Sequence, residues 1–457
     1  MNKLDIQHLY WRAGFGISPK QLELLSQKTR EEIVGDLFSK AKIHQPLYVD
    51  TSEFDTLSYE QFSRTKKTER EYIAKSRIKI KELNHEWVYR MSHTNNVLNE
   101  KVTLFWINHF SCHDRNILHL QNFNNTIRYQ GLGNFGDLVK AVSREATMIK
   151  YLDLRQNKKN RPNENFAREL MELFTLGVGN YTEEDIKEAA KAFTGYSFDF
   201  EGNFVFNESN HDNGFKYPFG KAGRYDGDDI IDTILEQKTC AEFICTKMYR
   251  YFVSDTISPD HIEEMVAVFY PKYEIEPVLK YMFSQDWFYK KEFIGNKIKS
   301  PIDLLVGISR VVPLNFKETN QLFHTQRLLG QKLFHPPNVA GWKGGRSWID
   351  SNTLMIRLKL PSLLLSQAYI STNENKESLK TLSKNTAKKE NKSNYKVSVD
   401  WKAFNSDFKD VPIENLTNYL LQSPINKGTQ EYLDRLVKSS KKDYCVQIMS
   451  LPEYQMC

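Results

Sequence analysis

The sequence predicts a mainly α-helical protein: one large helical domain with one small β-hairpin and long irregular loops. Apolar residues recur at helical spacing along most of the chain. Helix start signals such as Ser18-Pro19 and Ser300-Pro301 precede several of these segments. Only residues 196–206 alternate in the manner of a strand pair. The aromatic share of 13% supplies enough apolar surface for a sizeable core.

Helical periodicity is strongest in four segments: 21–38, 68–89, 99–110 and 182–193. Residues 99–110 (NEKVTLFWINHF) are too apolar for the surface and predict a buried helix. Thr182 and Asp185 occupy capping-box positions at the start of the last segment. A further helix is expected to begin after Ser300.

The exception to the helical pattern is residues 196–206 (YSFDFEGNFVF), in which aromatic and polar residues alternate. The alternation is centred on Glu201-Gly202-Asn203, which predicts a β-hairpin. A glycine-rich loop, residues 211–229, follows directly. Long loops on a helical scaffold are common places for functional residues.

The domain organisation follows from one change in composition. Residues 371–396 contain almost no apolar side chains and predict a flexible linker or insertion. Residues 1–370 then form the main helical domain, and residues 397–457 form a C-terminal helical segment that packs on it.

Composition and charge narrow the class of protein. The net charge of +6 is mild for this length, so no nucleic-acid partner is expected. No run approaches the ~18 apolar residues of a membrane span. Asp5 and His8 interrupt the opening residues, so no signal peptide is visible and a cytoplasmic location is expected. The five cysteines are odd in number and form no CxxC motif, which predicts reduced, buried thiols.

Four stretches of this chain together resemble one large bacterial family, catalogued as domain of unknown function 1800. They are His8-Leu9 with Arg12 to Gly16, residues 106–110 (WINHF), residues 162–195 and residues 329–354. The resemblance implies a helical fold. It also implies a sulfatase- or phosphatase-related partner, because genes of the family often lie beside genes of such proteins. No catalytic residues are carried over, and Ile107 stands where the family often has a histidine.

The segment Asn163 to Thr175 places Asn165, Arg168, Glu169 and Glu172 on one helical face. Two interpretations remain open. The face is a partly buried ion-pair network in which Arg168 satisfies a carboxylate, or Glu169 is a metal ligand or general base whose pKa is raised by burial.

Histidines indicate two candidate metal sites. His109 and His113 lie four residues apart, as metal-binding pairs on helices do, but the HExxH motif is absent and a buried core His109 is the alternative. His211 and Asp212 lie in the glycine-rich loop and are both suitable ligands for a divalent ion. Lys216 would neutralise an anionic substrate group there. The alternative is an Asx turn with a packed His211.

Residues 334–350 (FHPPNVAGWKGGRSWID) are dense in Pro, Gly and Trp. Asn338, Trp342 and Arg346 would line a substrate pocket with an aromatic wall and one guanidinium group. The alternative is a structural corner in which proline and glycine set the turns.

Two classes of function follow. The first is a metal-assisted enzyme acting on a polar or anionic substrate. Its catalytic residues would be Glu169, Arg168, His211 and Asp212, with a divalent metal ion on His109, His211 and Asp212. The second is a non-catalytic binding or assembly protein whose aromatic-rich face docks the sulfatase- or phosphatase-like partner. In the first case, residues 163–170, the His211-Asp212 loop and residues 334–342 are expected to face one cavity.

Overall fold

The computed structural model describes residues 1–54, 66–366, 396–436, 438 and 440–457. Over these residues the protein is mainly helical, with two small antiparallel sheets of two strands each, which confirms the predicted fold class. The α-helices are α1 (Lys3–Arg12), α2 (Pro19–Ser26), α3 (Arg30–Ala41), α5 (Lys66–His93), α6 (Val97–His109), α7 (Ile117–Gln130), α8 (Phe135–Ser143), α9 (Ala146–Tyr151), α10 (Asn165–Glu169), α11 (Glu183–Ala192), α12 (Gly227–Leu235), α13 (Lys238–Phe252), α14 (Pro259–Phe269), α15 (Ile275–Ser284), α16 (Pro301–Val311), α17 (Thr319–Leu329), α18 (Ser351–Leu365), α19 (Trp401–Asp407), α20 (Leu416–Leu420), α21 (Lys427–Arg435) and α22 (Lys441–Met449). A π-helix, η3 (Leu170–Thr175), continues α10. The strands are β1 (Tyr196–Phe198), β2 (Phe204–Phe206), β3 (Leu314–Phe316) and β4 (Val397–Val399).

Capping residues define the helix starts that the sequence predicted. Thr182 and Asp185 form the capping box of α11, and Ser300 does the same for α16 with Asp303. The predicted helix over 21–38 is two helices, because Thr29 begins α3 with a capping box of its own. Side-chain oxygens that satisfy free backbone N–H groups therefore explain these boundaries.

The two sheets differ in how far apart in the sequence their paired strands lie. The predicted hairpin pairs Tyr196 with Phe206 and Phe198 with Phe204. Its turn contains Gly202 at φ +94°, a conformation that glycine adopts without strain. The second sheet pairs β3 with β4, with Phe316 opposite Val397, and was not predicted.

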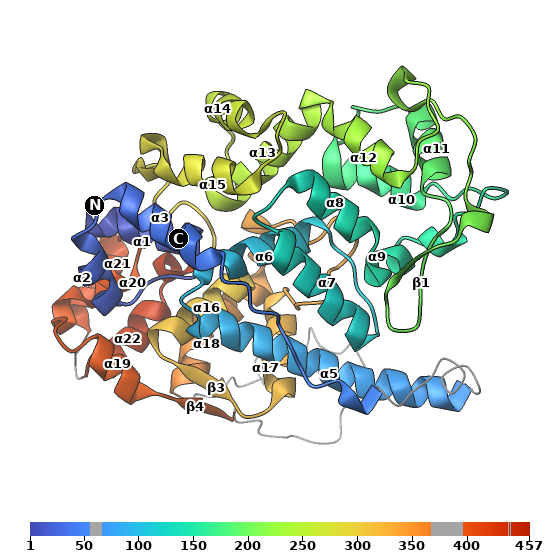
Figure 1. The fold of residues 1–457 in the computed structure, drawn as a ribbon. Coiled ribbons are helices and arrows are strands. Elements are labelled where there is room, and N and C mark those ends of the chain that lie inside the picture. The colour runs from blue at the N-terminus through green and yellow to red at the C-terminus, as the bar shows by residue number, and fades with distance from the viewer. Residues whose placement is uncertain (55–65, 367–395, 437, 439) are drawn as a thin grey trace.

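Figure 1 shows the N-terminal helices α1 to α3 and the C-terminal helices α19 to α22 together at one end of the molecule. The opposite end carries α9 to α12 and the hairpin, and α6 and α7 lie between the two. Gln7 Nε2 donates to the carbonyl of Asn418, which joins the two chain ends directly. The C-terminal segment is thus in contact with the main body, while its status as a separate unit stays a prediction. The predicted linker lies outside the described residues except for Lys396.

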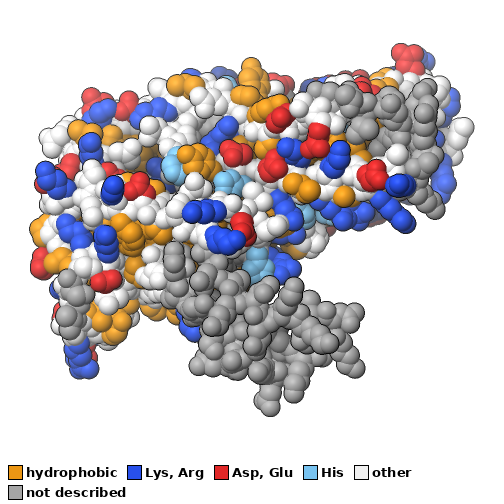
Figure 2. Space-filling view, turned by 90° about the horizontal axis from the view of Figure 1, so that it is seen from below, with side chains coloured by type: hydrophobic (Ala, Val, Ile, Leu, Met, Phe, Trp, Pro, Cys, Tyr) orange, Lys and Arg blue, Asp and Glu red, His pale blue; other side chains and the backbone are white. Residues whose placement is uncertain are grey.

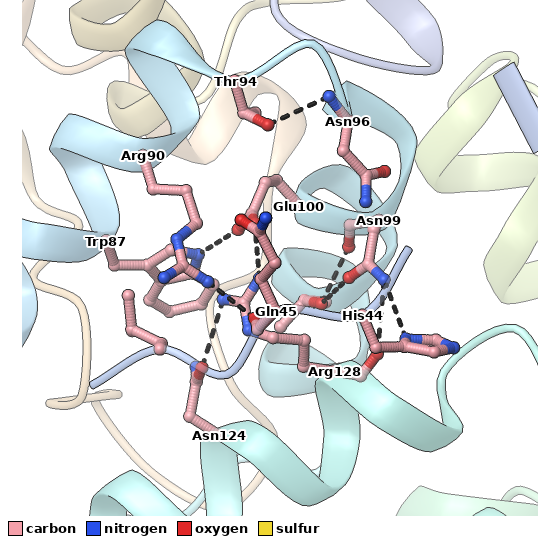
Figure 3. Close-up of polar contacts among 12 residues, drawn as sticks. His44, Gln45, Trp87, Arg90, Thr94, Asn96, Asn99, Glu100, Asn124 and Arg128 are labelled. Carbon is pink, nitrogen blue, oxygen red and sulfur yellow. Dashed lines mark hydrogen bonds and ion pairs between the residues drawn. The ribbon is translucent and has the colours of Figure 1, made fainter. Parts of the chain in front are cut away.

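A buried ion pair and a hydrogen bond, both made by Glu100, connect three helices of the core (Figure 3). Glu100 on α6 accepts a hydrogen bond from Trp87 Nε1 on α5 at 2.9 Å. Its other carboxylate oxygen pairs with the Arg128 guanidinium on α7. The two charged side chains are only 4% and 3% exposed. Each charge is therefore desolvated and depends on its partner.

All five cysteines are free and buried, as predicted. In the parts of the chain that the structure describes, no helix has both the length and the apolar character needed to cross a lipid bilayer. The cytoplasmic location and the expected absence of a nucleic-acid partner stay predictions.

Candidate functional site

The candidate site is built on the π-helix η3. Leu176 N and Gly177 N both donate to the carbonyl of Met171, at 2.8 and 3.0 Å, and close the wide final turn. Phe166, Leu170, Met171 and Phe174 are buried, so the polar residues between them face outward. π-helical turns inside helices are rare and occur frequently at functional sites.

The carbonyl end of η3 is capped by one half-buried and one buried side chain. Lys247 Nζ on α13 donates to the carbonyl of Leu173 at 2.9 Å, and His109 Nε2 at the end of α6 donates to the carbonyl of Phe174 at 3.0 Å. Burial lowers the pKa of Lys247 to about 8, with the Arg250 charge a smaller cause. Burial also holds the pKa of His109 well below its usual value. Both donors therefore satisfy carbonyls that a helix end leaves free.

Two carboxylates extend from this segment beside each other. Burial raises the pKa of Glu169, and the Glu172 charge raises it further. Tyr181 donates its hydroxyl to Glu172 Oε2 at 2.8 Å. Among the described residues, no group donates a hydrogen bond to the Glu169 carboxylate. Glu169 is thus a half-buried acid that stays free for an external partner.

Arg168 is engaged elsewhere, as the ion-pair interpretation predicted. Its Nη2 lies 2.7 Å from Glu183 Oε2 and 3.2 Å from Glu164 Oε2, and its Nη1 donates to Glu183 Oε1 at 2.8 Å. The guanidinium therefore fastens α10 to α11. Its charge lowers the pKa of Glu169 only as the smallest of three effects.

Tyr151 and His113 border the carboxylates. Burial raises the pKa of Tyr151, and the nearby Cys112 and Glu169 contribute in the same direction. The rings of His113 and Tyr151 lie 5.0 Å apart between centroids. Helix α6 ends at His109, so His113 is not on the same helical face as His109, and the reasoning from their spacing does not hold.

The His211-Asp212 loop satisfies its own polar groups. His211 Nδ1 donates to the carbonyl of Thr194 at 2.9 Å. Asp212 Oδ1 accepts from Gly214 N at 2.7 Å, which is the Asx turn considered as the alternative. Lys216 is buried and donates to the carbonyl of Asp212 at 2.6 Å, so its charge stabilises the loop itself.

The segment 334–350 is fastened to the end of α6. Trp342 N donates to Asn108 Oδ1 at 2.8 Å, and Asn108 Nδ2 returns a bond to the Trp342 carbonyl at 3.2 Å. Gly341, directly before Trp342, has φ +75°, and a Cβ there would lie 2.4 Å from the Asn108 carbonyl oxygen. Asn338 and Arg346 are exposed. This arrangement is a structural corner in which a tryptophan is buried.

Three of the four motif-bearing stretches therefore meet at the end of α6, through His109 with Phe174 and Asn108 with Trp342. The His211-Asp212 loop is held by Thr194 instead. Its polar groups need no shared cavity, and the expected convergence on one cavity stays a prediction. Sequence reasoning missed Tyr151, Tyr181 and Lys247, because no spacing rule singles out such residues.

The predicted metal ligands do not form a common donor set. Within the ranges that the structure covers, no three or more His, Cys, Asp or Glu side chains are placed to hold one ion. His109 and His211 each use a ring nitrogen to donate to a carbonyl. Metal binding through His109, His211 and Asp212 thus gains no support from this arrangement.

Fold and site define a helical protein whose motif-bearing segments are organised around a carboxylate-bearing π-helix. Residues 8–456 match the family model described as "Protein of unknown function (DUF1800)". The chain belongs to this family, since the match covers nearly all of it. No curated protein and no solved structure shows significant similarity to the chain.

Proposed function

We propose that this protein is an enzyme that acts on a polar substrate by general acid–base chemistry, with Glu169 as the proton-transferring group. One observation carries the proposal: Glu169 is a half-buried carboxyl that accepts no hydrogen bond from any residue the structure describes, and burial and the Glu172 charge raise its pKa. A carboxyl whose pKa is raised in this way is suited to giving a proton to a substrate.

The neighbouring groups support this role. Glu172 is already held by the Tyr181 hydroxyl, so the two carboxyls have different surroundings. Different surroundings separate the roles of an acid and a base in a carboxyl pair. In the proposed reaction Glu169 gives its proton to the leaving oxygen of the substrate. Glu172 takes the proton of the attacking group, which bonds to the reacting centre of the substrate as the bond to the leaving oxygen breaks. Tyr151 contacts the polar substrate.

The remaining predicted site residues have supporting positions in this proposal. Arg168 holds α10 against α11 and so positions Glu169. A direct role of His211, Asp212 or Lys216 in catalysis, and of Asn338, Trp342 and Arg346 in substrate binding, stays a prediction. Assistance by a divalent metal also stays a prediction, as does the alternative of an assembly protein that docks a sulfatase- or phosphatase-like partner.

The first test measures the pKa of Glu169 without knowledge of the substrate. NMR titration of isotope-labelled glutamate carboxyl carbons, with Glu169→Gln for assignment, is expected to show one carboxyl that titrates above the ordinary value of about 4.3. In Glu172→Gln this pKa should fall, because the neighbouring negative charge is gone. A Glu169 carboxyl that titrates at the ordinary value would contradict the proposal.

The second test measures activity on a panel of chromogenic esters, glycosides, phosphate esters and sulfate esters. Glu169→Gln should lower any turnover by ~10²-fold or more, the usual contribution of a general acid or base. Glu184→Gln is the matched control, because this exposed carboxylate on the same helix α11 pairs with Lys187 rather than with Arg168. Turnover that survives in Glu169→Gln would exclude the assigned role.

A further inference from the structure

The end of the molecule that carries the hairpin exposes large apolar side chains. Val205 and Phe206 on β2 are 41% and 40% exposed, and Phe215 and Tyr217 in the following loop are 59% and 56% exposed. Their neighbours in the hairpin, such as Tyr196, are buried. Exposed aromatic side chains at the open end of the hairpin and in the loop that follows it mark a surface for interaction.

Basic residues lie beside these apolar side chains. Lys158, Lys159 and Arg161 are exposed and occupy a tight turn that is closed by Arg161 N donating to the Lys158 carbonyl at 2.7 Å. Lys159 N donates to the carbonyl of Asn210 at 2.9 Å, which fastens this turn to the start of the 211–229 loop. The next residue, His211, has its ring 5.0 Å from the ring of Phe206.

Among the residues that the structure describes, no carboxylate forms an ion pair with Lys158, Lys159, Arg161 or Arg224. The Arg224 guanidinium lies over the ring of Phe215, 5.3 Å from its centroid. Figure 2, which views the molecule from below, shows Lys and Arg side chains at this end alongside hydrophobic and acidic ones. The positive charge is thus available to an external anion.

We propose that this basic and aromatic surface, formed by Lys158, Lys159, Arg161, Phe206 and Phe215, docks on an anionic phospholipid membrane. Charge complementarity carries the choice of occupant. Cations flanking protruding apolar side chains match the interface of an anionic bilayer, where phosphate groups border the acyl region. The hairpin and its loop lie at one end of the molecule, so a flat surface can reach them (Figure 1). The surface is independent of the acid–base pair at Glu169.

The test is cosedimentation of the full chain with vesicles of phosphatidylcholine alone and with vesicles that also contain phosphatidylglycerol. The protein is expected to bind only the anionic vesicles, and binding should weaken at high salt because screening reduces the attraction. Phe206→Ser with Phe215→Ser should lower the bound fraction at least about tenfold, and Lys158→Glu with Lys159→Glu should do the same.

The matched control is Leu24→Ser, because Leu24 is 66% exposed on α2 at the opposite end of the molecule. This variant should bind like the parent protein. Circular dichroism confirms that each variant is folded. Absence of binding to anionic vesicles overturns the proposal, and so does binding that the four substitutions leave unchanged. Binding to heparin or DNA but not to vesicles would instead assign the surface to a soluble polyanion.

Discussion

Removal of the charge at Glu100 tests whether the buried ion pair between α6 and α7 stabilises the protein. Glu100→Gln keeps the shape and an oxygen that accepts from Trp87 Nε1, but it leaves the Arg128 guanidinium buried without a counter-charge. Stranding one member of a buried pair typically costs ~3–5 kcal/mol. Glu100→Ala also leaves the indole N–H unpaired, which adds about 1–3 kcal/mol.

The assay is urea unfolding followed by circular dichroism, with the free energy of unfolding taken from the midpoint and slope. Glu23→Gln is the control, because Glu23 pairs with Lys3 where both side chains are about half exposed. Such an exposed pair contributes at most ~1 kcal/mol. A loss below ~1 kcal/mol in Glu100→Gln would refute the reasoning. Combining Glu100→Gln with Arg128→Met should recover part of the loss, since no unpaired charge then remains.

Two further predictions concern the Gly341 turn beside Asn108 and the Lys247 side chain that caps η3. Gly341→Ala should destabilise by about 2 kcal/mol or more, because φ is +75° and the new Cβ would lie 2.4 Å from the Asn108 carbonyl oxygen. Gly179→Ala is the control, because Gly179 has a similar φ but no neighbour within 4 Å of an added Cβ. It should lower the melting temperature less than Gly341→Ala does. The pKa of Lys247 falls from 10.5 to about 8 on folding, so its destabilising effect is full below pH 8 and disappears as pH rises toward 10.5. Stability should therefore gain more between pH 8 and 10 in the parent protein than in Lys247→Met, and equal pH profiles in denaturant unfolding would contradict this.

Local signals explain what the sequence could predict of the fold. Capping residues such as Thr182 and Ser300 act within one helical turn, and the Gly202 turn determines the hairpin register. The pairing of β3 with β4 joins residues about eighty positions apart, with Phe316 opposite Val397, and neither strand has a local signal for the other. The π-helix was not predicted either, because its i to i+5 bonds have no distinctive composition.

Only part of the candidate site could be predicted, because local sequence signals do not reveal contacts between distant segments. The spacing of Glu169 and Glu172 along one segment is a local signal, but Tyr181 reaches Glu172 from another segment, and Tyr151 also lies in a different part of the sequence. Lys216 was expected to face a substrate. Its amino group instead turns back to the Asp212 carbonyl, since a buried cation takes the nearest acceptors that its own loop provides.

The π-helix also has a consequence for insertions and deletions in this region. A π-turn holds one residue more than an α-turn, so the chain between Arg168 and Phe174 is one residue longer than an α-helix of the same rise needs. Deleting Met171 would let the segment close as an ordinary α-helix. Everything after the deletion would keep its orientation around the helix axis, because the deletion removes only the residue that the wide turn accommodates. A one-residue deletion in a regular α-helix such as α7 would instead rotate everything after it by about 100°. The π-helix is therefore the place in this segment where a change of one residue in chain length disturbs the flanking turns least.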